Sequence, residues 1–79
     1  MTALYLEDYL EKVNEGIRHH HDYSQGMRVY DVTRDSETKK LIYWRDLAPE
    51  SQGVKANIYQ QVIQEVKERI EREYALILP

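Results

Sequence analysis

Apolar side chains near the start of the chain recur at spacings of four, three and four residues, which places them on one face of a helix: Leu6, Leu10, Val13 and Ile17. Thr2 is of a residue type that caps helices, and Glu7 and Asp8 follow in the first turns, where the helix dipole favours acidic groups. We therefore predict a first helix that begins after Thr2 and ends between residues 16 and 21.

A longer helical pattern begins at Val54. Apolar residues recur there every four positions, with three more that widen the stripe: Val54, Ile58, Val62, Val66 and Ile70, with Tyr59, Ile63 and Tyr74. The apolar residues 75–78 follow and form either the last turn of this helix or a short third strand. Such a tail needs cover from the core or from a second subunit.

The pattern between the two helices is that of a β-hairpin. Residues 29–33 and 41–44 are rich in β-branched and aromatic side chains, and a polar turn separates them. A turn centred on Ser36 and Glu37 would pair Tyr30 with Tyr43. That register divides the apolar side chains into two sets: Tyr30, Val32, Leu41 and Tyr43 on one face, and Val29, Ile42 and Trp44 on the other.

These elements predict a single α+β domain over residues 1–79, in the order helix, hairpin, helix (αββα), with the short C-terminal strand as one form of the tail. Both helices are expected on one face of the hairpin. The other face retains Val29, Ile42 and Trp44, which is more apolar surface than a two-stranded sheet leaves in water. We therefore expect self-association through this face or through a strand edge, as a homodimer.

Composition narrows the class of protein. The chain has no cysteine, which excludes a disulfide framework, thiolate zinc ligands and a cysteine nucleophile. No apolar run approaches the roughly 20 residues of a membrane span, and the first ten residues are acidic rather than basic, unlike a signal peptide. These features lead us to expect a soluble, cytoplasmic protein without membrane contact.

Charge is segregated along the chain. The net charge is -3, yet residues 27–45 alone carry a net +2, from five basic and three acidic side chains. The five basic residues are Arg28, Arg34, Lys39, Lys40 and Arg45. The hairpin is therefore the basic segment of an acidic protein.

Candidate chemistry is sparse. His19, His20, His21 and Asp22 offer metal-ligand types, but consecutive residues of a helix point about 100° apart and do not converge on one ion. We predict a solvated helix end there and no metal site. No nucleophile elbow or phosphate-binding glycine loop is present, so we predict no catalytic residue, no cofactor and no enzyme activity.

The leading functional expectation is a small non-catalytic protein-interaction or regulatory module. Its partner-binding residues would lie on the hairpin: Tyr30, Tyr43, Trp44, Arg28, Arg34, Lys39, Lys40 and Arg45. The alternative is a small nucleic-acid-binding regulator that uses the same basic hairpin, since aromatic rings stack on bases and basic side chains contact phosphates. Asp31, Asp35 and Glu37 among the basic residues, and the overall pI near 5.5, weigh against this alternative.

Overall fold

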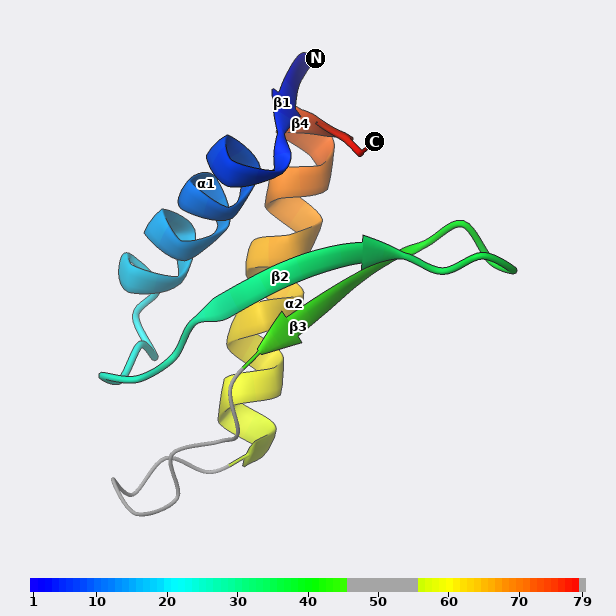
Figure 1. Ribbon diagram of the computed structural model, residues 1–79. Coiled ribbons are helices and arrows are strands. Elements are labelled where there is room, and N and C mark those ends of the chain that lie inside the picture. Colours follow the sequence, from blue (N-terminus) through cyan, green and yellow to red (C-terminus); the bar gives the residue numbers. More distant parts are fainter. Residues whose placement is uncertain (46–55, 79) are drawn as a thin grey trace.

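A computed structural model of the chain describes residues 1–45 and 56–78. The elements follow in the order β1 (Thr2–Tyr5), α1 (Leu6–Arg18), β2 (Val29–Arg34), β3 (Leu41–Arg45), α2 (Ala56–Glu73) and β4 (Tyr74–Ile77) (Figure 1). The α+β class is confirmed. The predicted αββα order is wrong in one respect, because a strand precedes the first helix. Of the two alternatives for the C-terminal tail, a helical turn or a short strand, the structure shows the strand.

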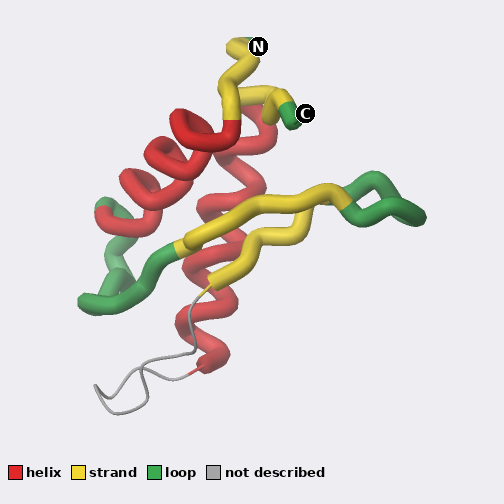
Figure 2. Tube along the Cα trace, in the orientation of Figure 1, coloured by secondary structure: helices red, strands yellow, loops and turns green. Residues whose placement is uncertain are grey.

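The extra strand, β1, pairs in parallel with β4, so that the two ends of the described chain lie side by side (Figure 2). Thr2 lies opposite Tyr74 in this small sheet and is not a helix cap. The residue that precedes α1 is instead Tyr5, whose extended backbone carries no capping side-chain hydrogen bond. Our N-cap assignment was wrong because the pairing partner of residues 2–5 lies some 70 positions away along the chain, beyond the reach of local sequence patterns.

The helices bury the faces that their periodicity indicates. A single cluster of buried residues joins both helices to β2: Tyr9, Val13, Ile17, Met27, Val29, Val32, Tyr59, Val62, Ile63, Val66 and Ile70. Ile58 departs from the predicted stripe and is 37% exposed near the start of α2. Val54 lies outside the described residues.

The two helices approach each other closely at Gly16 of α1. A Cβ atom there would lie 2.9 Å from Arg69 Nη2 and 3.1 Å from Val66 Cγ1 of α2. Val66 is buried and β-branched, so it has little freedom to move aside. Glycine therefore allows the C-terminal end of α1 to lie directly against the middle of α2.

The hairpin register differs from the predicted one by two residues. Val32 lies opposite Tyr43 and Thr33 opposite Ile42, and a β-bulge interrupts the pairing between Val29 and Asp31. The extra residue in the bulge reverses the side-chain alternation, so Val29 and Val32 are both buried although three positions separate them. The prediction that Val29 shares a face with Trp44 is therefore wrong.

Two helix side chains fix the start of β2 by binding its backbone. The Asn14 amide donates to Val29 O and accepts from Val29 N–H, each at 2.9 Å. The Tyr59 hydroxyl accepts from Arg28 N–H at 2.8 Å and donates to Arg28 O at 2.9 Å. Each helix thus satisfies both backbone groups of one residue, much as a neighbouring strand would, and this holds the hairpin across the two helices.

Candidate interaction surface

The β2–β3 hairpin presents an apolar surface on the side opposite the helices, which we call the outer surface: Tyr30, Asp31, Thr33, Ile42 and Trp44. Asp31 pairs with Trp44 and Thr33 with Ile42 across the two strands, so these four side chains share one face. Ile42 is 37% and Trp44 45% exposed. Tyr30, the extra residue of the bulge, borders this face and is 47% exposed.

Trp44 is held in place on this surface. Its indole Nε1–H donates to Thr33 Oγ1 at 2.8 Å across the strands. The indole polar group is therefore satisfied within the hairpin, while the residue as a whole stays 45% exposed. A fixed aromatic ring loses little side-chain entropy when a partner covers it, which is the property that makes Trp and Tyr frequent anchors of protein interfaces.

Tyr43, predicted to join the same contact set, lies on the opposite face. Its hydroxyl shares a hydrogen bond of 2.6 Å with the Tyr9 hydroxyl, and the two rings meet edge to face with centroids 6.3 Å apart. The Lys67 ammonium of α2 lies 5.5 Å from the centre of the Tyr43 ring. Burial, followed by the hydrogen bond with Tyr9, raises the pKa of Tyr43, so this side chain is a neutral part of the packing between hairpin and helices.

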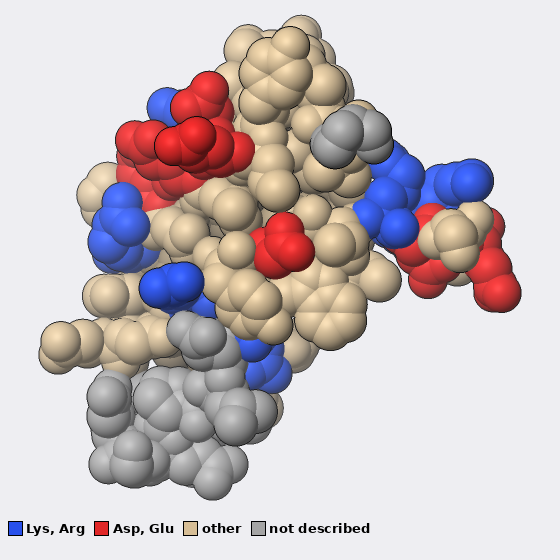
Figure 3. All heavy atoms as spheres, viewed as in Figure 1, with Lys and Arg blue, Asp and Glu red and all other residues tan. Residues whose placement is uncertain are grey.

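Three of the five predicted basic residues gather at the hairpin tip: Arg34, Lys39 and Lys40. Arg34 Nη1 donates to Lys39 O at 3.1 Å, and the backbones of Asp35 and Lys40 close the turn. All three basic side chains are exposed. Figure 3 shows them beside acidic groups of the same turn, so the tip is mixed in charge.

The other two basic residues lie at the opposite end of the hairpin. The Arg45 guanidinium lies over the Tyr59 ring, 4.5 Å from its centre, and Nη2 donates to Gln60 Oε1 at 3.4 Å. Arg28 is exposed next to the backbone contact with Tyr59. The structure therefore divides the predicted basic set between the two ends of the hairpin, with the outer surface between them.

Acidic groups gather elsewhere, on the solvent side of α1. Four exposed side chains form this acidic face, which is visible as the red area over α1 in Figure 3: Glu7, Asp8, Glu11 and Glu15. The tip of the hairpin lies on the other side of the molecule in that view. One chain thus presents a tip of mixed but net positive charge and an acidic face that point in different directions.

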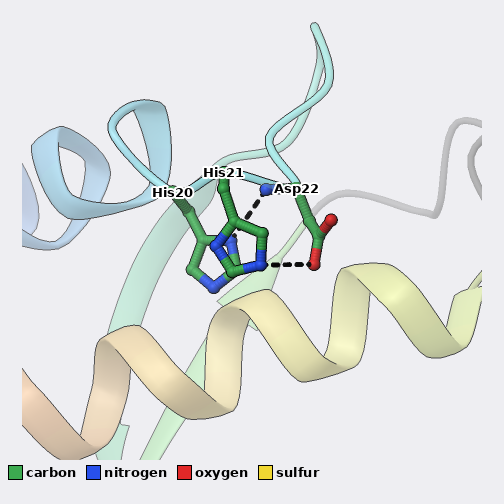
Figure 4. Close-up of side chains that lie close together, drawn as sticks. All are labelled: His20, His21 and Asp22. Atoms are coloured by element: carbon green, nitrogen blue, oxygen red, sulfur yellow. Dashed lines mark hydrogen bonds and ion pairs between the residues drawn. The ribbon is translucent and has the colours of Figure 1, made fainter.

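The histidine run lies directly after α1, which ends at Arg18. Among the described residues, His20, His21 and Asp22 form the one group whose potential metal-ligand atoms all lie within 4.8 Å of one another (Figure 4). The prediction assumed helical geometry for these residues, and the structure places them in a turn instead. Glu65 of α2 reaches His20 Nε2, a contact that no sequence spacing indicates.

The sequence matches no known protein family, and comparisons with curated proteins and with solved structures also find no match. Neither helix in the described part of the chain combines the length and the apolar character needed to cross a membrane.

Proposed function

We propose that this protein is a small non-catalytic protein-interaction module that binds through the outer surface of its hairpin and associates with a second copy of itself. The observation that carries the proposal is the exposure of Tyr30, Ile42 and Trp44 on one surface of a two-stranded ribbon. Asp31 and Thr33 of the same surface border a hollow that Leu6 and Leu78 also line, while the three apolar side chains stay more than a third exposed. Three large apolar side chains grouped in this way are typical of a site that another molecule covers.

Charge indicates the kind of partner. Arg28 and Arg45 lie at one end of the outer surface, and the tip at the other end carries three basic and two acidic side chains. The net charge of both ends is positive, so a complementary surface is apolar in its centre and acidic at its rim. The acidic face of α1 supplies such a rim on a second copy of the chain. We therefore propose a homodimer in which the hairpin of each protomer lies near the α1 helix of the other, an arrangement that is compatible with two-fold symmetry.

The test is the mass of the untagged protein in solution, measured by light scattering from 5 to 300 µM. We expect a concentration-dependent dimer. Trp44→Ala should weaken it at least about thirtyfold, since central aromatic anchors of interfaces typically contribute 2 kcal/mol or more. A wild-type monomer at every concentration would contradict the proposed dimer.

A matched control separates a specific surface from general stickiness. Ile42 on the outer surface and Ile58 on α2 are both 37% exposed, and Ile58 lies outside both the hairpin and α1. Ile42→Ala should weaken the dimer, whereas Ile58→Ala should leave it unchanged. Equal weakening by the two substitutions would show that association does not depend on the outer surface.

The second candidate is nucleic-acid binding, and the gathering of Arg34, Lys39 and Lys40 at an exposed tip favours it. It predicts an affinity for single-stranded oligonucleotides that falls steeply between 50 and 200 mM salt, because phosphate contacts release counterions. The dimer should respond much less to salt because its centre is apolar. Fluorescence anisotropy with wild-type protein and with Lys39→Gln/Lys40→Gln distinguishes the two, and salt-sensitive binding lost in the double variant would support nucleic acid.

A further inference from the structure

A cluster of side chains after α1, distant from the hairpin tip and independent of the proposed interface, carries a different kind of chemistry. It consists of His20, His21 and Asp22 in the turn (Figure 4). Glu65 of α2 reaches His20 Nε2. The side chain of His20 is 9% exposed and that of His21 is 81% exposed, so one imidazole is enclosed by the protein and the other lies at the surface.

The hydrogen bonds of His20 determine which ring nitrogen carries its proton. Nδ1 accepts the backbone N–H of Asp22 at 3.0 Å, so the proton resides on Nε2 and is donated to the Glu65 carboxylate. Histidines that bind metals are held in this way: one nitrogen donates to a carboxylate and the other presents its lone pair to the ion. His20 therefore presents Nδ1 toward Asp22 with its tautomer and orientation already set.

The neighbouring groups have the spacing of metal ligands. His21 Nε2 and Asp22 Oδ2 are 3.3 Å apart. Two zinc ligands at about 2.0–2.1 Å from the ion in a tetrahedral site lie roughly 3.3 Å from each other. The rings of His20 and His21 are stacked with centroids 4.5 Å apart. The His21 ring must therefore tilt before its Nε2 lone pair can point at an ion that His20 and Asp22 also bind.

We infer that His20 Nδ1, His21 Nε2 and the Asp22 carboxylate form a binding site for a divalent first-row transition metal such as Zn²⁺, with Glu65 as the positioning residue for His20. The negative end of the α1 dipole, where the last carbonyls of the helix are oriented toward this turn, favours a cation here. Arg69 lines the same hollow as His20 and His21, and the Glu65 carboxylate in that lining offsets its charge. Binding displaces the hydrogen bond from the Asp22 backbone to Nδ1 and the direct contact between His21 Nε2 and Asp22 Oδ2.

The test is titration of untagged protein with ZnCl2 by calorimetry, together with the thermal unfolding midpoint with and without Zn²⁺. We expect one ion per chain and a higher midpoint, because the native turn binds the ion better than the unfolded chain does. His21→Ala should weaken binding more than tenfold. Glu65→Gln should weaken it about tenfold, as loss of a carboxylate that orients a ligand histidine typically does.

His19→Ala is the matched control, since His19 belongs to the same run but not to the cluster. It should change the affinity less than twofold. Zn²⁺ binding by a flexible histidine run without defined geometry would give a different result. His19→Ala and His21→Ala would then weaken binding equally, and Glu65→Gln on α2 would have no effect. That result, or wild-type protein that does not bind at 1 mM Zn²⁺, would overturn the assignment; circular dichroism of each variant verifies the fold.

Discussion

Tyr43 and Trp44 are neighbours on β3, and the structure uses them in opposite ways. Tyr43 points to the helices, where its hydroxyl bonds Tyr9 and the Lys67 ammonium lies over its ring. Trp44 points away, donates its indole N–H to Thr33 Oγ1 across the hairpin, and stays 45% exposed. Alternation along one short strand therefore separates a residue that stabilises the fold from one that is available to a partner.

This difference shows how a small ribbon can serve two purposes. The inner face is joined to both helices through the buried cluster and through the backbone contacts of Asn14 and Tyr59. The outer surface contributes little to that packing, so its apolar residues are free to serve binding. Substitutions on the two faces should accordingly separate stability from association.

The largest effect is expected from Tyr43→Ala. The substitution removes an aromatic ring from the packing between hairpin and helices and leaves the Tyr9 hydroxyl without this partner. The free energy of unfolding should fall by about 3 kcal/mol, which is most of the stability of a domain this small. Urea denaturation followed by circular dichroism measures it.

Trp44→Ala is the paired substitution one residue along the strand. It should lower the free energy of unfolding by less than about 1 kcal/mol, the usual range for one cross-strand contact. The comparison fails if Trp44→Ala destabilises the fold as much as Tyr43→Ala does.

Sequence patterns predicted the elements that depend on local periodicity. Both helices, the hairpin and the α+β class follow from apolar spacing, because each pattern lies within one continuous stretch. β1 escaped prediction because its partner, β4, is at the other end of the chain. The hairpin register escaped it because the turn is centred one position later than Ser36 and Glu37, which shifts the pairs by two residues. The bulge at Tyr30 escaped it as well, because no residue type marks that position.

The candidate residues were predictable as a group and not in their arrangement. Composition singled out the aromatic and basic residues of the hairpin, but their division between faces and ends depends on the bulge and on contacts with α2. The cluster at residues 20–22 was set aside because helical geometry was assumed for it. The contact with Glu65 joins positions 45 residues apart, and only the close approach of the helices at Gly16 brings them together.

A second substitution tests the inner face without changing its shape. Tyr59→Phe removes only a hydroxyl, and with it the two hydrogen bonds to the backbone of Arg28. Leaving a partly buried backbone group without its hydrogen-bond partner typically costs about 1–3 kcal/mol. We therefore expect the free energy of unfolding to fall by about 2 kcal/mol and hydrogen exchange at the Arg28 amide to become faster. Tyr5→Phe, at an exposed site, should change neither quantity.

Alkaline pH offers a third test of the inner face. Burial raises the pKa of both Tyr9 and Tyr43. Tyrosines of the unfolded chain ionise near pH 10 while these two keep their protons in the native state, so unfolding releases protons and stability falls as pH rises above 10. The loss should be roughly 1 kcal/mol per pH unit, measured as urea midpoints from pH 9 to pH 11.

Two phenylalanine variants assign this pH dependence to a face. Tyr43→Phe should make the decline in stability above pH 10 shallower, because one of the protons held in the native state is gone. Tyr9→Phe should do the same, because burial raises the pKa of Tyr9 as well. A decline that neither variant makes shallower would contradict the assignment to the inner face.

The smallest expected effect lies at the hairpin tip, which belongs to neither face. Lys39 has a positive φ of 64°, a left-handed conformation that asparagine adopts more readily than lysine. Lys39→Asn should therefore raise the free energy of unfolding by about 0.5 kcal/mol while leaving the proposed dimer unchanged. A change in dimer affinity as large as that from Trp44→Ala would show that the contact extends to the tip, and that stability and association are not divided between the two faces alone.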